Sequence, residues 1–117
     1  MIVAALLASA LAVSEPAASA PPPECDKGPA AVTLARTGWL AYGCKDGRSA
    51  ALIAAPGNPA SPMVFRIQPT AEAFRITGEG RGDRAVVSAA FQELSAMPPQ
   101  RLRALVLQAN GGLDAGR

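Results

Sequence analysis

The chain has 117 residues, of which 50% are apolar and only 17% are charged, and its formal net charge is +2. This length suits one small domain, near the size at which burial of a core alone gives marginal stability. The sequence contains no histidine, which excludes Ser-His and Cys-His catalytic pairs and the usual acid-base group near neutral pH. The basic residues are scattered, so no electrostatic stripe for nucleic acid is expected.

The first twenty residues are typical of a secretory signal peptide. Residues 2–13 form an uncharged apolar run, and the small residues 17–20 provide a cleavage zone. The run is too short to span a bilayer comfortably. No basic residue precedes it, so a buried N-terminal helix or a membrane anchor stays open as an alternative. We predict a signal peptide over 1–20 and a periplasmic or secreted protein without a stable membrane span after its removal.

The remaining chain divides into a linker, a domain and a tail. Three consecutive prolines make residues 21–24 a stiff linker, and we expect a folded domain over 25–110 and a flexible tail over 111–117. The only two cysteines, Cys25 and Cys44, are expected to form a disulfide in an oxidising compartment. A reactive thiol assisted by a lysine is the alternative, and two cysteines without histidine do not make a zinc site.

The first half of the domain predicts one helix and two strands. Residues 29–36 favour a short helix, with Pro29 in its first turn and Gly38 just past its end. A strand is expected over 39–44. Asp46-Gly47 then predicts a hairpin turn leading to a second strand over 49–55, because both turn residues tolerate positive φ.

The next two segments predict a second hairpin. Side chains alternate between two faces over 63–68 and again over 74–77, with a short connection between them. If Ile67 lies opposite Phe74, the same register places Arg66 opposite Arg75 on the outer face, where like charges repel unless a carboxylate, water or ligand intervenes.

Arg66 and Arg75, with Trp39 nearby, are therefore the candidate binding residues. Their forked guanidinium donors suit an acidic protein, a carboxylate or a phosphate. Two plainer alternatives stay open. The arginines keep an exposed sheet face soluble and discourage edge pairing, and Trp39 packs in the core beside the disulfide.

A glycine-rich turn ends the sheet and opens the helical part. Asp83 is placed to cap a helix that runs to about residue 96, and Pro98-Pro99 separates it from a second helix that ends at Asn110-Gly111. Both helices carry an apolar stripe. The candidate turn and cap residues are Gly78, Glu79, Gly80, Gly82 and Asp83.

These elements predict an α+β fold. We expect a four-stranded, mostly antiparallel meander with two C-terminal helices packed on one face and one disulfide. The other face of the sheet is expected to be at least partly open.

The glycine-rich turn carries weak likenesses to three kinds of site. It lacks the following Lys-Ser/Thr and the repeated βαβ pattern of nucleotide-binding loops. It contains one copy of a calcium-binding repeat that works only in stacked copies, with Glu79 and Asp83 as the oxygen ligands. Arg81-Gly82-Asp83 spells an adhesion tripeptide, but Asp83 is already used as a cap. A strand-to-helix turn that needs positive φ explains the glycines more simply.

Catalysis has little support in this sequence. A Ser-Lys dyad has no distinctive spacing, and Glu79 and Asp83 sit beside arginines, where a raised carboxyl pKa is not expected. We predict no enzymatic activity, no cofactor and no metal.

Two resemblances carry further expectations. Trp39, Cys44-Lys45-Asp46-Gly47, residues 56–59 and the turn at 78–83 resemble small exported alphaproteobacterial proteins of unknown function, over residues 25 to about 109. This resemblance implies a family but no activity. Tyr42-Gly43-Cys44-Lys45-Asp46-Gly47 is also similar to the strand start of periplasmic inhibitors of c-type lysozyme. That likeness covers six residues, lacks the inhibitory loop and does not account for two C-terminal helices.

Together these features predict a small exported non-enzymatic protein that binds a protein or an anionic envelope component. The alternatives are a periplasmic inhibitor or accessory of a cell-envelope hydrolase, and a structural or stress-induced envelope protein.

Overall fold

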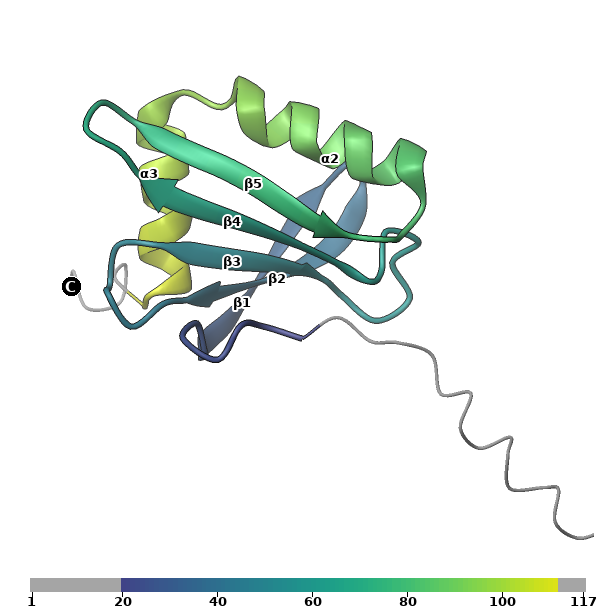
Figure 1. Cartoon of the computed structure of the whole chain (residues 1–117), viewed down its shortest axis with the longest axis horizontal. Coiled ribbons are helices and arrows are strands. Elements are labelled where there is room, and N and C mark those ends of the chain that lie inside the picture. The colour runs from purple at the N-terminus through teal and green to yellow at the C-terminus, as the bar shows by residue number, and fades with distance from the viewer. Residues whose placement is uncertain (1–19, 112–117) are drawn as a thin grey trace, which may run out of the picture.

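The computed structural model describes residues 20–111 of the chain (Figure 1). Its elements, in chain order, are β1 (Lys27–Leu34), β2 (Thr37–Gly43), β3 (Ala50–Ala54), β4 (Met63–Pro69), β5 (Phe74–Gly80), α2 (Arg84–Ala96) and α3 (Pro99–Ala109). The segment expected to be the signal peptide lies outside the described residues except for residue 20, and so does the expected tail after residue 111.

The fold is α+β, as predicted, but the sheet has five strands rather than four. Each strand pairs antiparallel with the next one along the chain, in the order β1-β2-β3-β4-β5. The predicted Asp46-Gly47 turn joins β2 to β3, with Gly47 at a φ of 70°. The meander prediction is therefore confirmed, with one strand more than expected.

The additional strand, β1, occupies the segment that we expected to be a helix. Ala30, Val32 and Leu34 alternate with exposed neighbours and face the core, which is a period of two rather than 3.6. Pro29 is accommodated because β1 is an edge strand, where a missing N–H costs no hydrogen bond of the sheet. The helix prediction over 29–36 was wrong because it rested on Pro29 and Gly38 as helix ends, whereas the side chains between them alternate with a period of two.

Both helices pack on one face of the sheet (Figure 1). Trp39 and Phe65 form the centre of the core, each 1% exposed, with ring centroids 5.4 Å apart. Ala90 and Leu94 from α2 and Leu102 and Val106 from α3 complete the buried cluster.

The start of α2 follows the prediction from sequence. The Asp83 side chain accepts a hydrogen bond from the Val86 backbone N–H at 3.1 Å, which satisfies one of the free donors of the first turn. Gly82 is required here, because a Cβ at this position would collide with the Ala60 backbone.

The opposite face of the sheet carries the disulfide. Cys25 and Cys44 are bonded, as predicted. They pack with Ala51 in a second buried cluster, against Tyr42 and Val64. This face is therefore partly covered by the chain that precedes β1, rather than being fully open. Neither helix of the part of the chain that the structure describes is long and apolar enough to cross a bilayer.

Candidate functional site

The two arginines chosen from sequence do not face each other. Arg66 pairs across the sheet with Thr77, and Arg75 pairs with Gln68. The true register differs by two residues from the predicted one, because β4 continues to Pro69 and pairs there with Phe74. Both arginines keep the outer face, since a shift of two residues preserves the face of every side chain.

Arg66 already has an anionic partner. Its guanidinium forms an ion pair of 2.7 Å with the Glu24 carboxylate, which lies in the predicted proline-rich linker. The hydrogen bond from Arg66 is the main cause that holds the pKa of Glu24 below its usual range. The pair ties the chain before Cys25 to the outer face of the sheet, so Arg66 serves a contact within the molecule.

Trp39 lies in the core rather than on a binding surface. Its indole N–H is shared between the Leu34 carbonyl at 3.2 Å and the Thr37 hydroxyl at 3.0 Å. With its ring buried and its single donor satisfied, Trp39 presents nothing to a ligand. It packs in the core, but not beside the disulfide, which lies on the opposite face of the sheet.

The glycine-rich turn shows no arrangement of ligands. Glu79 and Asp83 are exposed, and within residues 20–111 no three acidic, histidine or cysteine side chains gather as metal ligands do. Gly78 and Gly80 belong to β5, and the backbone there approaches Met63 and Phe65 closely.

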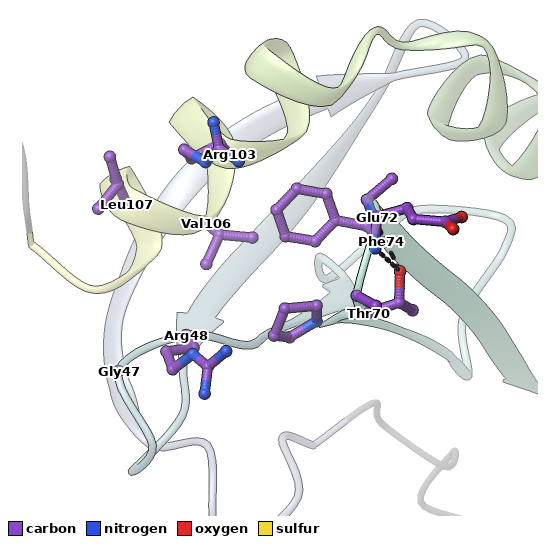
Figure 2. Close-up of a pocket in the computed structure, with 11 residues that line it drawn as sticks. Gly47, Arg48, Thr70, Glu72, Phe74, Arg103, Val106 and Leu107 are labelled. Carbon is purple, nitrogen blue, oxygen red and sulfur yellow. Dashed lines mark hydrogen bonds between the residues drawn. The ribbon is translucent and has the colours of Figure 1, made fainter.

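The strongest candidate site is a pocket at one end of the sheet. It has a volume of about 350 Å³ and lies between the β2–β3 turn, the β4–β5 turn and residues 103–107 of α3 (Figure 2). The lining residues are Gly47, Arg48, Pro69, Thr70, Ala71, Glu72, Ala73, Phe74, Arg103, Val106 and Leu107.

The lining of this pocket combines apolar side chains with charged ones, of which Arg48 and Arg103 form its arginine rim. Figure 2 shows the Phe74 ring directed toward Val106, with Arg48 and Arg103 on opposite sides of the pocket. Leu107 is 43% exposed and adds apolar surface to the lining. The Glu72 carboxylate extends away from both arginines (Figure 2). The pocket thus joins apolar surface to two cations from different elements.

Arg48 is placed by a tightly bonded turn. One carboxylate oxygen of Asp46 accepts hydrogen bonds from the backbone N–H groups of Arg48 at 2.8 Å and Ser49 at 2.9 Å. The other oxygen accepts one from the Ser49 hydroxyl at 2.7 Å. These bonds, first the one from the Arg48 N–H, lower the pKa of Asp46 from its usual value of 3.8. Asp46 therefore stays ionised and fixes the turn that presents Arg48.

The opposite turn is held in a similar way. The Thr70 hydroxyl oxygen accepts hydrogen bonds from the backbone N–H groups of Glu72 at 3.3 Å and Ala73 at 3.0 Å, as the dashed lines in Figure 2 show. The Thr70 N–H in turn donates to the Ala73 carbonyl at 3.0 Å. Both walls made by turns are thus preorganised by side chain to backbone bonds.

Comparison with known proteins gives no guide to the ligand of this pocket. No protein-family model, curated protein or solved structure shows a significant match. The chemistry of the site must therefore be argued from its own residues.

Sequence reasoning missed this site for a physical reason. Arg48 and Arg103 are 55 positions apart, one in a turn and one on a helix, and each has the sequence context of an ordinary solvated arginine. Only the packing of α3 against the sheet brings them to one pocket. The single local sign of the pocket is Leu107, a large apolar residue on the exposed side of α3.

Proposed function

We propose that this chain is a small exported, non-enzymatic binding protein and that its ligand is an amphiphilic anion of the cell envelope. A carboxylate or phosphate group binds at the arginine rim of the pocket, and an apolar tail lies against Phe74, Val106 and Leu107. The single observation that carries the proposal is that two arginines and the apolar side chains of Phe74, Val106 and Leu107 line the same pocket.

The charge of the site supports an anion rather than a cation. Among the described residues, the ion pair found is the one between Arg66 and Glu24, so within residues 20–111 neither Arg48 nor Arg103 forms an ion pair with a carboxylate. Guanidinium groups donate several hydrogen bonds in a fixed plane, which matches carboxylate and phosphate oxygens. Glu72 is the only acid in the lining and points away (Figure 2).

The apolar side of the pocket supports a ligand with a tail. A free inorganic anion would leave the ring of Phe74 and the exposed Leu107 side chain in contact with water. Covering apolar surface stabilises a complex by about 25 cal/mol for each Å² removed from water. An amphiphile uses both halves of the pocket, whereas acetate or phosphate uses only the rim.

The location we propose is extracytoplasmic. The Cys25–Cys44 disulfide is typical of an oxidising compartment, and the apolar run over 2–13 has the length of a signal-peptide core. Fractionation of cells that express the full chain tests this part. We expect the protein in the periplasm or medium, with a new N-terminus near residue 20 and no free thiol. Recovery of the uncleaved chain in the cytoplasm would contradict export.

The non-enzymatic part of the proposal is supported by the composition of the pocket. Its only hydroxyl belongs to Thr70 and accepts bonds from backbone N–H groups. No residue of the lining is a cysteine, lysine or histidine, so the pairs that activate a nucleophile are missing from it.

Binding is tested with three soluble probes that differ in charge or in tail. Octanoate carries both the anion and the tail, octylammonium reverses the charge, and acetate removes the tail. Isothermal titration of the disulfide-intact protein should show saturable binding of octanoate, with both other probes at least about tenfold weaker.

Two arginine variants and one matched control locate the site. Arg48→Ala and Arg103→Ala should each weaken octanoate binding by about tenfold, because each removes charge-assisted hydrogen bonds. Arg101→Ala removes the same charge from the same helix, outside the pocket, and should leave binding unchanged. Equal binding of octylammonium, or an equal loss in Arg101→Ala, would contradict the proposed site.

A further inference from the structure

The strand β5 forms one edge of the sheet, and α2 runs beside it (Figure 1). β5 is last in the strand order, and no strand of residues 20–111 pairs with its outer side. Four consecutive residues of β5, from Thr77 to Gly80, are exposed. An exposed edge offers unpaired backbone donors and acceptors to another strand.

The other edge of the sheet is protected, which makes β5 the exception. In β1 the pairing is interrupted between Lys27 and Ala30, and Pro29 lies in this interruption. A proline and a bulge are the usual means of preventing edge-to-edge association. β5 contains neither a proline nor a shift in register.

The hydrogen-bond pattern shows which residues of β5 point outward. The Thr70 N–H bonds to Ala73 at one end of the β4–β5 hairpin, and the Arg81 N–H bonds to Pro62 at the other. Bonded pairs alternate along an antiparallel ladder. Arg75, Thr77 and Glu79 therefore bond to β4, whereas the backbone groups of residues 74, 76, 78 and 80 are directed to the free edge.

We propose that β5 pairs antiparallel with β5 of a second copy of this chain, about a two-fold axis at Thr77. In this register Ile76 of each copy forms the hydrogen-bonded pair with Gly78 of the other. All seven residues of β5 then find a partner. A register shifted by one residue would place a residue whose backbone groups face the free edge opposite one whose backbone groups face β4. The hydrogen-bond ladder could then not form.

Charge complementarity selects this register among those that the ladder allows. Thr77 lies midway between Arg75 and Glu79, so the two-fold axis places Arg75 of each copy opposite Glu79 of the other. Both residues are on the outer face and exposed. The pairs that do not exchange hydrogen bonds bring their side chains closest. Moving the axis to residue 75 or 79 would instead oppose like charges.

An apolar groove on the helix side fits the same pairing. It has a volume of about 350 Å³ and lies between β5 and α2, over Gly78, Phe65 and Phe91. Phe91 is 40% exposed and stacks on Phe65 at 6.2 Å. Because Gly78 has no side chain, the neighbouring Ile76 of the second copy can lie over this groove. The dimer would then be a continuous sheet with the helices of both copies on one face.

The charge variants test the dimer separately from the binding pocket, because neither Arg75 nor Glu79 lines that pocket. It is tested by sedimentation of the protein that accumulates when the full chain is expressed, with its disulfide intact. The wild-type protein should dimerise with increasing concentration. Arg75→Glu and Glu79→Arg should each raise the dimer dissociation constant by about tenfold, because two attractive pairs become two repulsive ones.

Exchanging the charges at positions 75 and 79 tests the proposed register most directly. In a mixture of Arg75→Glu and Glu79→Arg chains, every cross-strand pair is again of opposite charge, so the mixture should dimerise more tightly than either variant does alone. The double variant Arg75→Glu/Glu79→Arg should also recover wild-type dimerisation. Arg101→Glu, an exposed charge reversal on α3, is the control and should change nothing.

Cross-linking at Thr77 tests the same register with both charged residues in place, even if a charge variant folds poorly. Thr77→Cys should form a disulfide-linked dimer under mild oxidation, because the two copies of this residue face each other. Thr33→Cys, on an exposed position of β1, should not. A wild-type protein that stays monomeric at the highest attainable concentration, or a dimer insensitive to both charge reversals, would overturn the proposal.

Discussion

The Asn110 side chain donates a hydrogen bond to the backbone carbonyl of Ser49, at 3.2 Å. It donates a second bond to the Val106 carbonyl at 2.9 Å and so closes the end of α3. Asn110 thereby joins α3, which carries Arg103, to the turn that carries Arg48. One residue at the helix terminus fixes the distance between two walls of the pocket.

Replacing this residue should loosen both the fold and the site. Asn110→Ala leaves two carbonyl groups without this donor, and we expect a loss of about 1–2 kcal/mol in the free energy of unfolding. Octanoate binding should weaken as well, because the two arginines are no longer held together. Gln108→Ala, an exposed change on the same helix, is the control. Urea denaturation that gives equal stability for both variants would contradict the role of Asn110.

The backbone of the β1–β2 turn is strained, and a substitution can relieve this strain. Its two central residues, Ala35 and Arg36, have φ values of 52° and 60°, a region that glycine adopts at little steric cost. Arg36→Gly should therefore raise the free energy of unfolding by about 0.5–1 kcal/mol. Arg36→Val, with a branched Cβ, should lower it. If thermal denaturation showed Arg36→Val to be more stable than Arg36→Gly, this turn would have a different conformation.

The same turn explains which parts of the fold were predictable from sequence. Asp46-Gly47 is a local signal for a hairpin and was recognised, as was Asp83 as a helix cap. Ala35-Arg36 is not a typical turn pair, so β1 was assigned to a helix. The register of β4 and β5 depends on where the strands end, which periodicity alone does not determine. The pocket depends on long-range packing, and Leu107 is its only local sign in the sequence.

The disulfide should contribute substantially to stability. It closes a loop between residues 19 positions apart, and loop-closure entropy gives about 3 kcal/mol for a loop of this size. The double variant Cys25→Ser/Cys44→Ser should lose this amount in urea denaturation, and a reducing agent should destabilise the wild type but not the variant. Equal stability of both proteins with and without the reductant would contradict this contribution.

Acid should destabilise the protein through Asp46. Its pKa is lower in the folded state than its usual value of 3.8, so the folded state favours the ionised form. The resulting stability is fully present above pH 4 and is lost as the pH falls through the lowered folded-state pKa. Asp46→Asn should reduce the free energy of unfolding at pH 7 by roughly 1 kcal/mol. It should also flatten the slope of that free energy against pH below pH 4. An unchanged slope in that range would contradict the role of Asp46.

The most direct test of the central claim is to map octanoate on the folded protein by the backbone amide signals in nuclear magnetic resonance. We expect saturable shifts that cluster at the two turns and at the end of α3, including Gly47, Thr70 and Leu107. The same titration of Arg103→Ala should need about tenfold more octanoate. Shifts confined to the groove between β5 and α2, or spread evenly over the surface, would contradict a ligand site at this end of the sheet.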